Sequence, residues 1–109
     1  MRTWLALALA IVLTAPFTLV VAMEAHATEY TVVIEKLKFG PLPAELRVGD
    51  VIVWQNKDLF RHTATARDDS FDVDLPAGAE GKMILAHAGT FDFFCRFHPG
   101  MTGTLVVSP

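Results

Sequence analysis

The chain has 109 residues, of which 52% are hydrophobic and 19% charged, and its formal net charge at pH 7 is −3. A chain of this length is expected to fold as one domain. Its charges are scattered and slightly acidic on balance, which argues against a protein that binds nucleic acid or is drawn to an anionic membrane surface.

The first segment of the chain is apolar and ends in a small-residue pattern. Residues 4–21 form a nearly unbroken hydrophobic run, and Ala25-His26-Ala27 has the small-x-small pattern of a signal-peptidase site. We therefore expect residues 1–27 to be a secretory signal that is cleaved after Ala27. Residues 28–109 would remain as a periplasmic or otherwise exported domain without a membrane span. The alternative is an uncleaved anchor, because the run approaches the roughly 20 apolar residues that span a bilayer.

Glycines and prolines divide the rest of the chain into short segments whose apolar residues alternate as in strands. Residues 30–34 alternate, and the pattern resumes with the opposite parity at residues 37–39, which predicts one strand with a bulge or bend. Residues 46–48 lead into a Gly49-Asp50 turn. The continuous apolar run of residues 51–54 is suited to a strand buried on both faces.

The later segments continue this pattern to the end of the chain. Phe91, Phe93 and Cys95 would share one face of a strand, so the thiol is expected to point towards the core. Alternating or apolar segments also occupy residues 71–75, 83–85 and 104–107. The whole pattern predicts an all-β domain, a β-sandwich of about seven or eight short strands.

Three residues with metal-binding side chains lie close together after the Phe91 segment. Cys95, His98 and Met101 are spaced three residues apart, and Pro99-Gly100 favours a tight turn between them. One loop could therefore direct a thiolate, an imidazole and a thioether to a single point. Cys95 is also the only cysteine of the chain, so it cannot form an internal disulfide. Metal binding would explain such a thiol in an exported protein.

A fourth ligand must come from another segment, and His62 and His87 are the remaining histidines beyond the predicted signal. His62 is the better candidate, because it lies where a loop enters a further β-rich segment, whereas His87 lies beside a turn expected at the surface. Two histidines and a cysteine with an axial methionine are typical of blue-copper electron-transfer sites. Zinc would gain little from a neutral thioether. We therefore predict a copper site with His62, Cys95, His98 and Met101 as ligands.

Four segments of the domain carry a resemblance to a known family, namely residues 49–56, 62–65, 71–72 and 95–103. They resemble the cupredoxins, and within that family the plastocyanin and amicyanin branch. The short Cys-x-x-His-x-x-Met loop is most similar to that of amicyanin. The resemblance implies a Greek-key β-sandwich that holds one mononuclear type 1 copper ion near one end, ligated by His62, Cys95, His98 and Met101.

The resemblance also implies a function. In such proteins the second histidine is partly exposed within an apolar ring that meets redox partners, and here Phe97, Pro99 and Phe60 would form that ring around His98. We therefore expect a one-electron carrier that cycles between Cu(II) and Cu(I), a monomer without enzymatic activity. Copper carriage or storage without redox cycling is the alternative.

Two residues beside His62 depart from the family pattern. The family often has Pro before the first histidine and Asn after it, where this chain has Arg61 and Thr63. The hydrogen bonds around the ligands, which tune such sites, therefore cannot be carried over from the family to this chain.

The carboxylates of Asp68-Asp69 and of residues 72 and 74 are either a solvated strand edge or an acidic patch for a basic partner.

Overall fold

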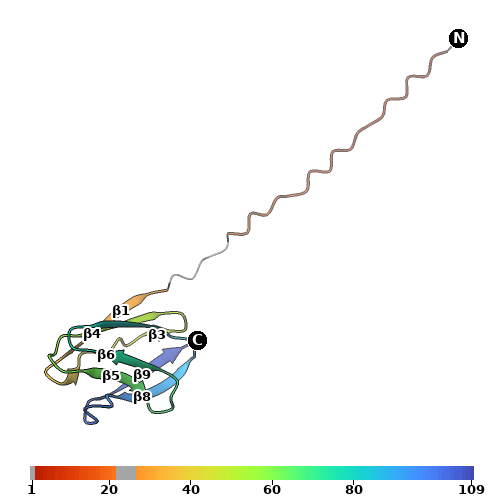
Figure 1. Ribbon diagram of the computed structural model, residues 1–109. Helices are drawn as coiled ribbons and strands as arrows, with labels where there is room; N and C mark the ends of the chain where they lie inside the picture. The colour runs from red at the N-terminus through yellow and green to blue at the C-terminus, as the bar shows by residue number, and fades with distance from the viewer. Residues whose placement is uncertain (1, 22–26) are drawn as a thin grey trace.

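The chain folds into a sandwich of two β-sheets (Figure 1). The structure is a computed structural model that describes residues 2–21 and 27–109. Within these ranges it contains nine strands and no helix, which confirms the all-β prediction. There are more strands than the seven or eight predicted, because β2 and β3 have only two residues each and are too short to show an alternating pattern.

Both sheets combine strands that are distant in the sequence. The first sheet contains, in spatial order, β2 (Lys38–Phe39), β1 (Glu29–Glu35), β4 (Val51–Asn56) and β7 (Glu80–Ile84). The second contains β3 (Leu46–Arg47), β9 (Thr102–Ser108), β8 (Gly89–Phe94), β5 (His62–Ala66) and β6 (Asp72–Leu75). The chain therefore crosses repeatedly between the two sheets, as in Greek-key sandwiches.

The first two strands form a hairpin, so the prediction of one bulged strand over residues 30–39 was wrong. β1 pairs antiparallel with β2 in the register Ile34↔Phe39. Lys36 and Leu37 connect them with φ angles of 54° and 57°. Two-residue hairpin turns of this kind usually contain Asn and Gly, which tolerate positive φ. Because Lys-Leu is not a turn signal, the sequence shows only the change of parity.

The strand β4 lies inside the first sheet, between β1 and β7. It pairs in parallel with β1 from Glu29↔Val51 onward and antiparallel with β7. Ile52, Val53 and Trp54 are all buried. This is the outcome that a continuous apolar run predicts for a strand covered on both faces.

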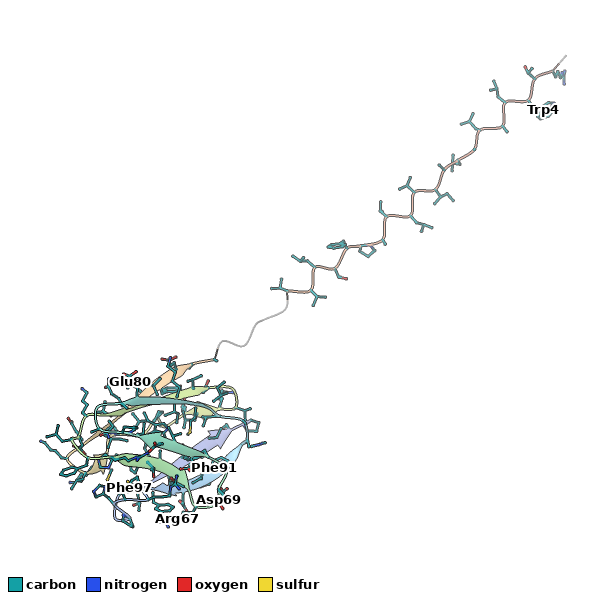
Figure 2. All side chains as sticks on the ribbon, in the orientation of Figure 1. Trp4, Arg67, Asp69, Glu80, Phe91 and Phe97 are labelled. Atoms are coloured by element: carbon teal, nitrogen blue, oxygen red, sulfur yellow. The ribbon has the colours of Figure 1, made fainter. Side chains whose placement is uncertain are left out.

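Three aromatic rings join the two sheets inside the sandwich. Phe39 and Trp54 belong to the first sheet and Phe93 to the second, and their ring centroids lie 4.8 to 5.8 Å apart in edge-to-face arrangements. Each such pair contributes about 0.5–1.5 kcal/mol beyond the burial of its area. Side chains fill the space between the sheets (Figure 2), and this packing holds β8 in place.

The pairing of β5 with β8 brings two predicted ligands to the same end of the second sheet. The two strands pair antiparallel through Thr65↔Phe94. Phe93 and Cys95 are fully buried, which confirms that the thiol points towards the core. His62 is the first residue of β5 and is also fully buried. The imidazole and the thiol therefore enter the interior side by side.

The described part of the predicted signal segment, residues 2–21 and Ala27, contributes no strand to this sandwich. Residues 2–21 contain neither helix nor strand and are exposed along their length (Figure 1). Among the described residues, no helix has the length and apolar character needed to cross a membrane. Ala25 and His26 of the predicted cleavage site lie outside the described residues. The signal peptide and its cleavage after Ala27 therefore stay predictions.

Candidate metal centre

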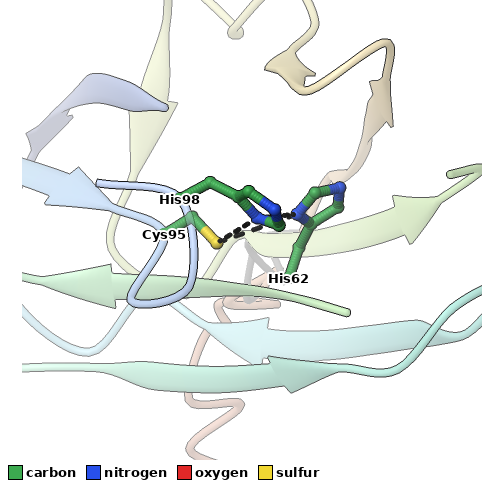
Figure 3. Close-up of side chains that lie close together, drawn as sticks. All are labelled: His62, Cys95 and His98. Atoms are coloured by element: carbon green, nitrogen blue, oxygen red, sulfur yellow. Dashed lines mark hydrogen bonds between the residues drawn. The ribbon is translucent and has the colours of Figure 1, made fainter. Parts of the chain in front are cut away.

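Three of the four predicted ligands converge at one end of the sandwich (Figure 3). The Nδ1 atoms of His62 and His98 are 3.2 Å apart. The Sγ of Cys95 lies 3.7 Å from the first nitrogen and 3.8 Å from the second. His62 and Cys95 are fully buried, whereas His98 is partly exposed. The two histidines and the cysteine thus form a small triangle of donor atoms with one corner, that of His98, towards the solvent.

The size of this triangle can be tested against a bound metal ion. For sides of 3.2, 3.7 and 3.8 Å, the point equidistant from the three donors lies about 2.1 Å from each of them, by the circumradius of the triangle. Zinc, a first-row metal ion with such ligands, lies about 2.0–2.1 Å from histidine nitrogens and about 2.3 Å from cysteine sulfur in proteins. The three donors therefore fit one first-row transition-metal ion without rearrangement.

Met101 closes the loop that carries two of these donors. Its backbone N–H donates to the carbonyl of His98 at 2.9 Å, and its carbonyl accepts the N–H of Cys95 at 3.0 Å. The side chain is buried, with 5% of its surface exposed. These two backbone hydrogen bonds hold the loop in one tight turn, as the spacing and Pro99-Gly100 predict.

The carboxylate of Asp58 orients His62 from the side away from the triangle. Its Oδ2 lies 2.7 Å from Nε2 of His62. An ionised carboxylate only accepts hydrogen bonds, so the proton of the imidazole must be on Nε2. The lone pair of Nδ1 then faces the other two donors, as metal binding requires. Asp58 is the main functional residue that the sequence analysis missed.

The same carboxylate also stabilises the β1–β2 turn. Its oxygens accept the backbone N–H groups of Lys36 at 2.7 Å and Leu37 at 3.0 Å, the two residues with positive φ. Burial by itself would raise the pKa of Asp58, but the hydrogen bonds with His62, Leu37 and Lys36 outweigh it and hold that pKa below its ordinary value. The carboxylate is therefore ionised at neutral pH.

Thr63 connects the two ligand-bearing segments. Its backbone N–H donates to the Sγ of Cys95 at 3.4 Å, and its hydroxyl accepts the N–H of Arg96 at 2.9 Å. The hydroxyls of Thr63 and Thr65 are 2.9 Å apart, and Thr65 donates to the carboxylate of Asp72 at 2.7 Å. Because the proton of Thr65 is used there, the hydroxyl of Thr63 must donate to Thr65. Thr63 therefore connects β5 to the segment of Cys95 and Arg96, at the position where the family pattern has Asn.

Two arginines neutralise the carboxylates of β6. The guanidinium of Arg96 pairs with Asp72, and that of Arg61 with Asp74. Arg61 also lies over the ring of Phe97, 5.5 Å from its centroid. Both pairs are about half exposed, so each contributes little to stability. The acidic residues of β6 are thus partners of the arginines beside the ligands rather than a free acidic patch.

His87 is exposed and is not among the three clustered donors, as its place beside a surface turn predicts.

A β-sandwich with a buried cluster of two histidines and a cysteine, and with a methionine on the same loop, defines a class of small mononuclear copper proteins.

The chain belongs to the Cupredoxin-like domain family, which it matches over residues 3–107. It is 27% identical over 94 residues to amicyanin of Paracoccus versutus, an alignment that covers 81% of this chain and 71% of that protein. It is also 27% identical over 93 residues to amicyanin-alpha of Methylorubrum extorquens, covering 77% of this chain and 76% of the relative. The predicted resemblance to cupredoxins, and to amicyanin among them, is confirmed.

Solved structures agree with this assignment. The reduced Cu(I) form of an amicyanin variant superposes with a TM-score of 0.62 at 26% identity, covering 78% of this chain and 87% of that one. A purple cupredoxin from Nitrosopumilus maritimus superposes with a TM-score of 0.62 at 22% identity, covering 72% of this chain and 98% of its own, and supports the fold alone. With this family, and with Met101 beside the triangle, the site matches a type 1 copper site, and copper is the cofactor.

The first prediction concerns Asp58. In Asp58→Asn the side chain keeps one oxygen but gains an NH₂ group, so it cannot accept from His62 and from both turn N–H groups together. We expect copper affinity to fall about 10–100-fold, the usual effect of losing such a partner, in a competition titration with a chelator. Asp68→Asn, at an exposed carboxylate, is the control. An unchanged affinity in Asp58→Asn would contradict the orienting role.

The second prediction concerns Thr63. Thr63→Val keeps the shape of the side chain but leaves the N–H of Arg96 without its acceptor. It also removes the donor to the hydroxyl of Thr65, which keeps its hydrogen bond to Asp72. The free energy of unfolding should fall by about 1–3 kcal/mol, the cost of unsatisfied buried groups, when metal-free protein is unfolded in urea. Thr63→Ser keeps the hydroxyl and should retain most of the stability. A Thr63→Val variant as stable as the wild type, or one more stable than Thr63→Ser, would contradict this role of the hydroxyl.

Proposed function

We propose that this chain is an exported one-electron carrier in which His62, Cys95, His98 and Met101 hold a single type 1 copper ion. The bound copper supplies the redox chemistry by alternating between Cu(II) and Cu(I). The protein supplies the ligand positions, the shielding from water and the surface at which partners approach. We assign it no substrate chemistry of its own.

The observation that carries this proposal is the donor triangle with its two supports. Nδ1 of His62 is directed by Asp58, and the sulfur of Cys95 is held by the N–H of Thr63. Both donors are fully buried. Ligands that are held in place need to move little when the charge of the bound ion changes. A site that accepts and releases electrons benefits from this, whereas a copper carrier must open to release its metal.

The surface around His98 supports docking of a redox protein. Phe60 and Phe97 are 57% and 54% exposed, and Leu59 is 92% exposed. The ring of Phe60 lies 6.1 Å from that of His98, and Phe97 protrudes from the sandwich (Figure 2). Exposed apolar residues around a partly exposed ligand would let a partner come close to the copper without displacing tightly bound water. We assign this patch, with Pro99, to partner docking.

Residues 1–27 support export, with cleavage after Ala27 and a periplasmic or otherwise extracytoplasmic location for residues 28–109. Copper would then bind in a compartment where a lone thiol is otherwise exposed to oxidation. Ligation by Cys95 gives that thiol a function and protects it.

The third prediction is optical. The exported protein should become intensely blue on addition of Cu(II), because charge transfer from a cysteine thiolate to copper absorbs visible light, and Cys95→Ser should remove the colour. His87→Gln, at an exposed histidine outside the cluster, is the matched control and should stay blue. A colourless wild-type complex would refute the type 1 assignment.

Reversibility separates the electron carrier from the alternative of copper carriage. In a redox titration the colour should disappear and return over repeated cycles with no loss of copper. Release of Cu(I) to a competing chelator within a cycle would favour carriage instead.

The fourth prediction tests the docking patch with the protein as its own redox partner. Phe97→Lys places a charge in the apolar patch, so two molecules should approach less readily. Electron self-exchange between oxidised and reduced protein, measured by magnetic-resonance line broadening, should slow about tenfold or more, while the absorption spectrum stays the same. Ile84→Lys, at an apolar residue that is 71% exposed on β7, is the control. Equal slowing by both variants would rule out docking at Phe97.

A further inference from the structure

A buried carboxylate lies at the end of the sandwich opposite the metal centre. Asp50 is only 6% exposed. One of its oxygens accepts the backbone N–H of Thr28 at 3.0 Å, and the other accepts the N–H of Arg47 at 2.9 Å. The strand β4 separates Asp50 from Asn56 at the copper end, a distance of about 20 Å at roughly 3.3 Å per residue.

Asp50 has no ion-pair partner in the part of the chain that the structure describes. The ion pairs found there involve other carboxylates, and no side-chain nitrogen of a Lys, Arg or His lies within 4.0 Å of this one. Its two partners are neutral amide groups. A carboxylate that is removed from water without a counter-charge lowers stability, even where hydrogen bonds satisfy its oxygens.

Thr28 is the residue that cleavage after Ala27 would place at the N-terminus. Hydrolysis of the Ala27–Thr28 peptide bond consumes one water molecule and leaves a carboxylate on Ala27 and an ammonium group on Thr28. The nitrogen that is already 3.0 Å from Asp50 would then carry a positive charge. Cleavage would supply the missing counter-charge at the atom that contacts the carboxylate.

We propose that Asp50 is the receptor for the new α-amino group of Thr28, and that processing thereby stabilises the domain by forming a partly buried ion pair. This inference depends on the proposed cleavage after Ala27 and is independent of copper binding. An unprocessed chain would lack the ion pair and be easier to unfold, which suits a chain that has yet to be exported. The processed chain would gain stability where it works.

The backbone on both sides of this contact is held in place. The carbonyl of Thr28 accepts the N–H of Val51 at 2.9 Å, and β1 begins at the next residue. The N–H of Asp50 donates to the carbonyl of Arg47 at 3.0 Å. The Thr28 nitrogen therefore cannot move far from the carboxylate. One additional residue before Thr28 would move the ammonium group by about 3.8 Å and restore an amide at this position.

Other titratable groups on the elements around this end are distinct from the proposed pair. Glu29 of β1 is exposed and pairs with Lys82 of β7 at 3.6 Å, which makes Glu29 a suitable control next to the same terminus. The further titratable groups on these elements and the segments beside them are Tyr30 and Glu35 of β1, Glu80 of β7, Glu45, Arg47 and His87.

The experiment compares two exported forms of the full chain. One has the natural sequence, and the other has a glycine inserted between Ala27 and Thr28, so that cleavage after Ala27 leaves one extra residue. Mass spectrometry should identify Thr28 as the first residue of the natural form. Asp50→Asn is made in both, and unfolding in urea is measured at pH 6.5. We expect Asp50→Asn to raise the unfolding constant at least tenfold more in the natural form, which corresponds to a rise of one unit in the amine pKa.

A substitution at Glu29, made in the same two forms, serves as the control. Glu29→Gln should change both forms equally, within about twofold. A first residue other than Thr28, or equal effects of Asp50→Asn in the two forms, would overturn the proposal. The absorption spectrum with copper should be the same in all variants, so a failure here is distinct from a failure of the electron-carrier function.

The pH dependence gives a second test that needs no substitution of Asp50. An ion pair raises the pKa of the amine above its ordinary value of about 7.7–8.0. The extra stability of the natural form over the glycine-inserted form should therefore be complete below that range and be lost as pH rises through the raised pKa. A magnetic-resonance titration that finds the pKa of the Thr28 amine at or below the ordinary range would overturn the proposal.

Discussion

The structure at the metal end depends on bringing two imidazole nitrogens and one sulfur within 3.8 Å of one another in a largely buried place. The lone pairs of such donors repel one another, and the donors compete for protons. A bound cation, or hydrogen bonds that fix which atom carries a proton, removes this conflict. The protein supplies those hydrogen bonds through Asp58 on His62 and through the N–H of Thr63 on Cys95. The β1–β2 turn contacts this site through Asp58, and the backbone of Arg96 contacts it through Thr63.

Asp58 connects features that belong to different sheets. His62 begins β5 of the second sheet, while the turn at Lys36 and Leu37 joins β1 and β2 of the first. One carboxylate accepts hydrogen bonds from both. Backbone with positive φ at residues other than glycine costs about 1–3 kcal/mol per residue and is kept where its surroundings over-determine it. Here the strained turn and the orientation of the ligand are stabilised by the same group.

The departures beside His62 have physical replacements. The hydroxyl of Thr63 makes the contact between the ligand loops, and Arg61 links the loop before His62 to Asp74 and to the ring of Phe97. Arg61 and Arg96 neutralise the carboxylates of β6, and the surface around His98 presents apolar side chains with paired charges at their edge. A partner that docks there would meet no strong net field from this strand, so shape and apolar contact would decide the fit.

Much of this protein follows from local sequence patterns. The alternation of apolar residues determined the all-β class and the inward direction of Cys95, because strand parity needs only neighbouring residues. The spacing of Cys95, His98 and Met101 indicated that one loop carries three potential ligands. The tertiary structure alone decided the short strands, the hairpin at Lys36-Leu37 and the role of Asp58. Each depends on groups about twenty or more residues apart in sequence or on a contact with no local signal, and only the packed sheets bring those groups within hydrogen-bonding distance.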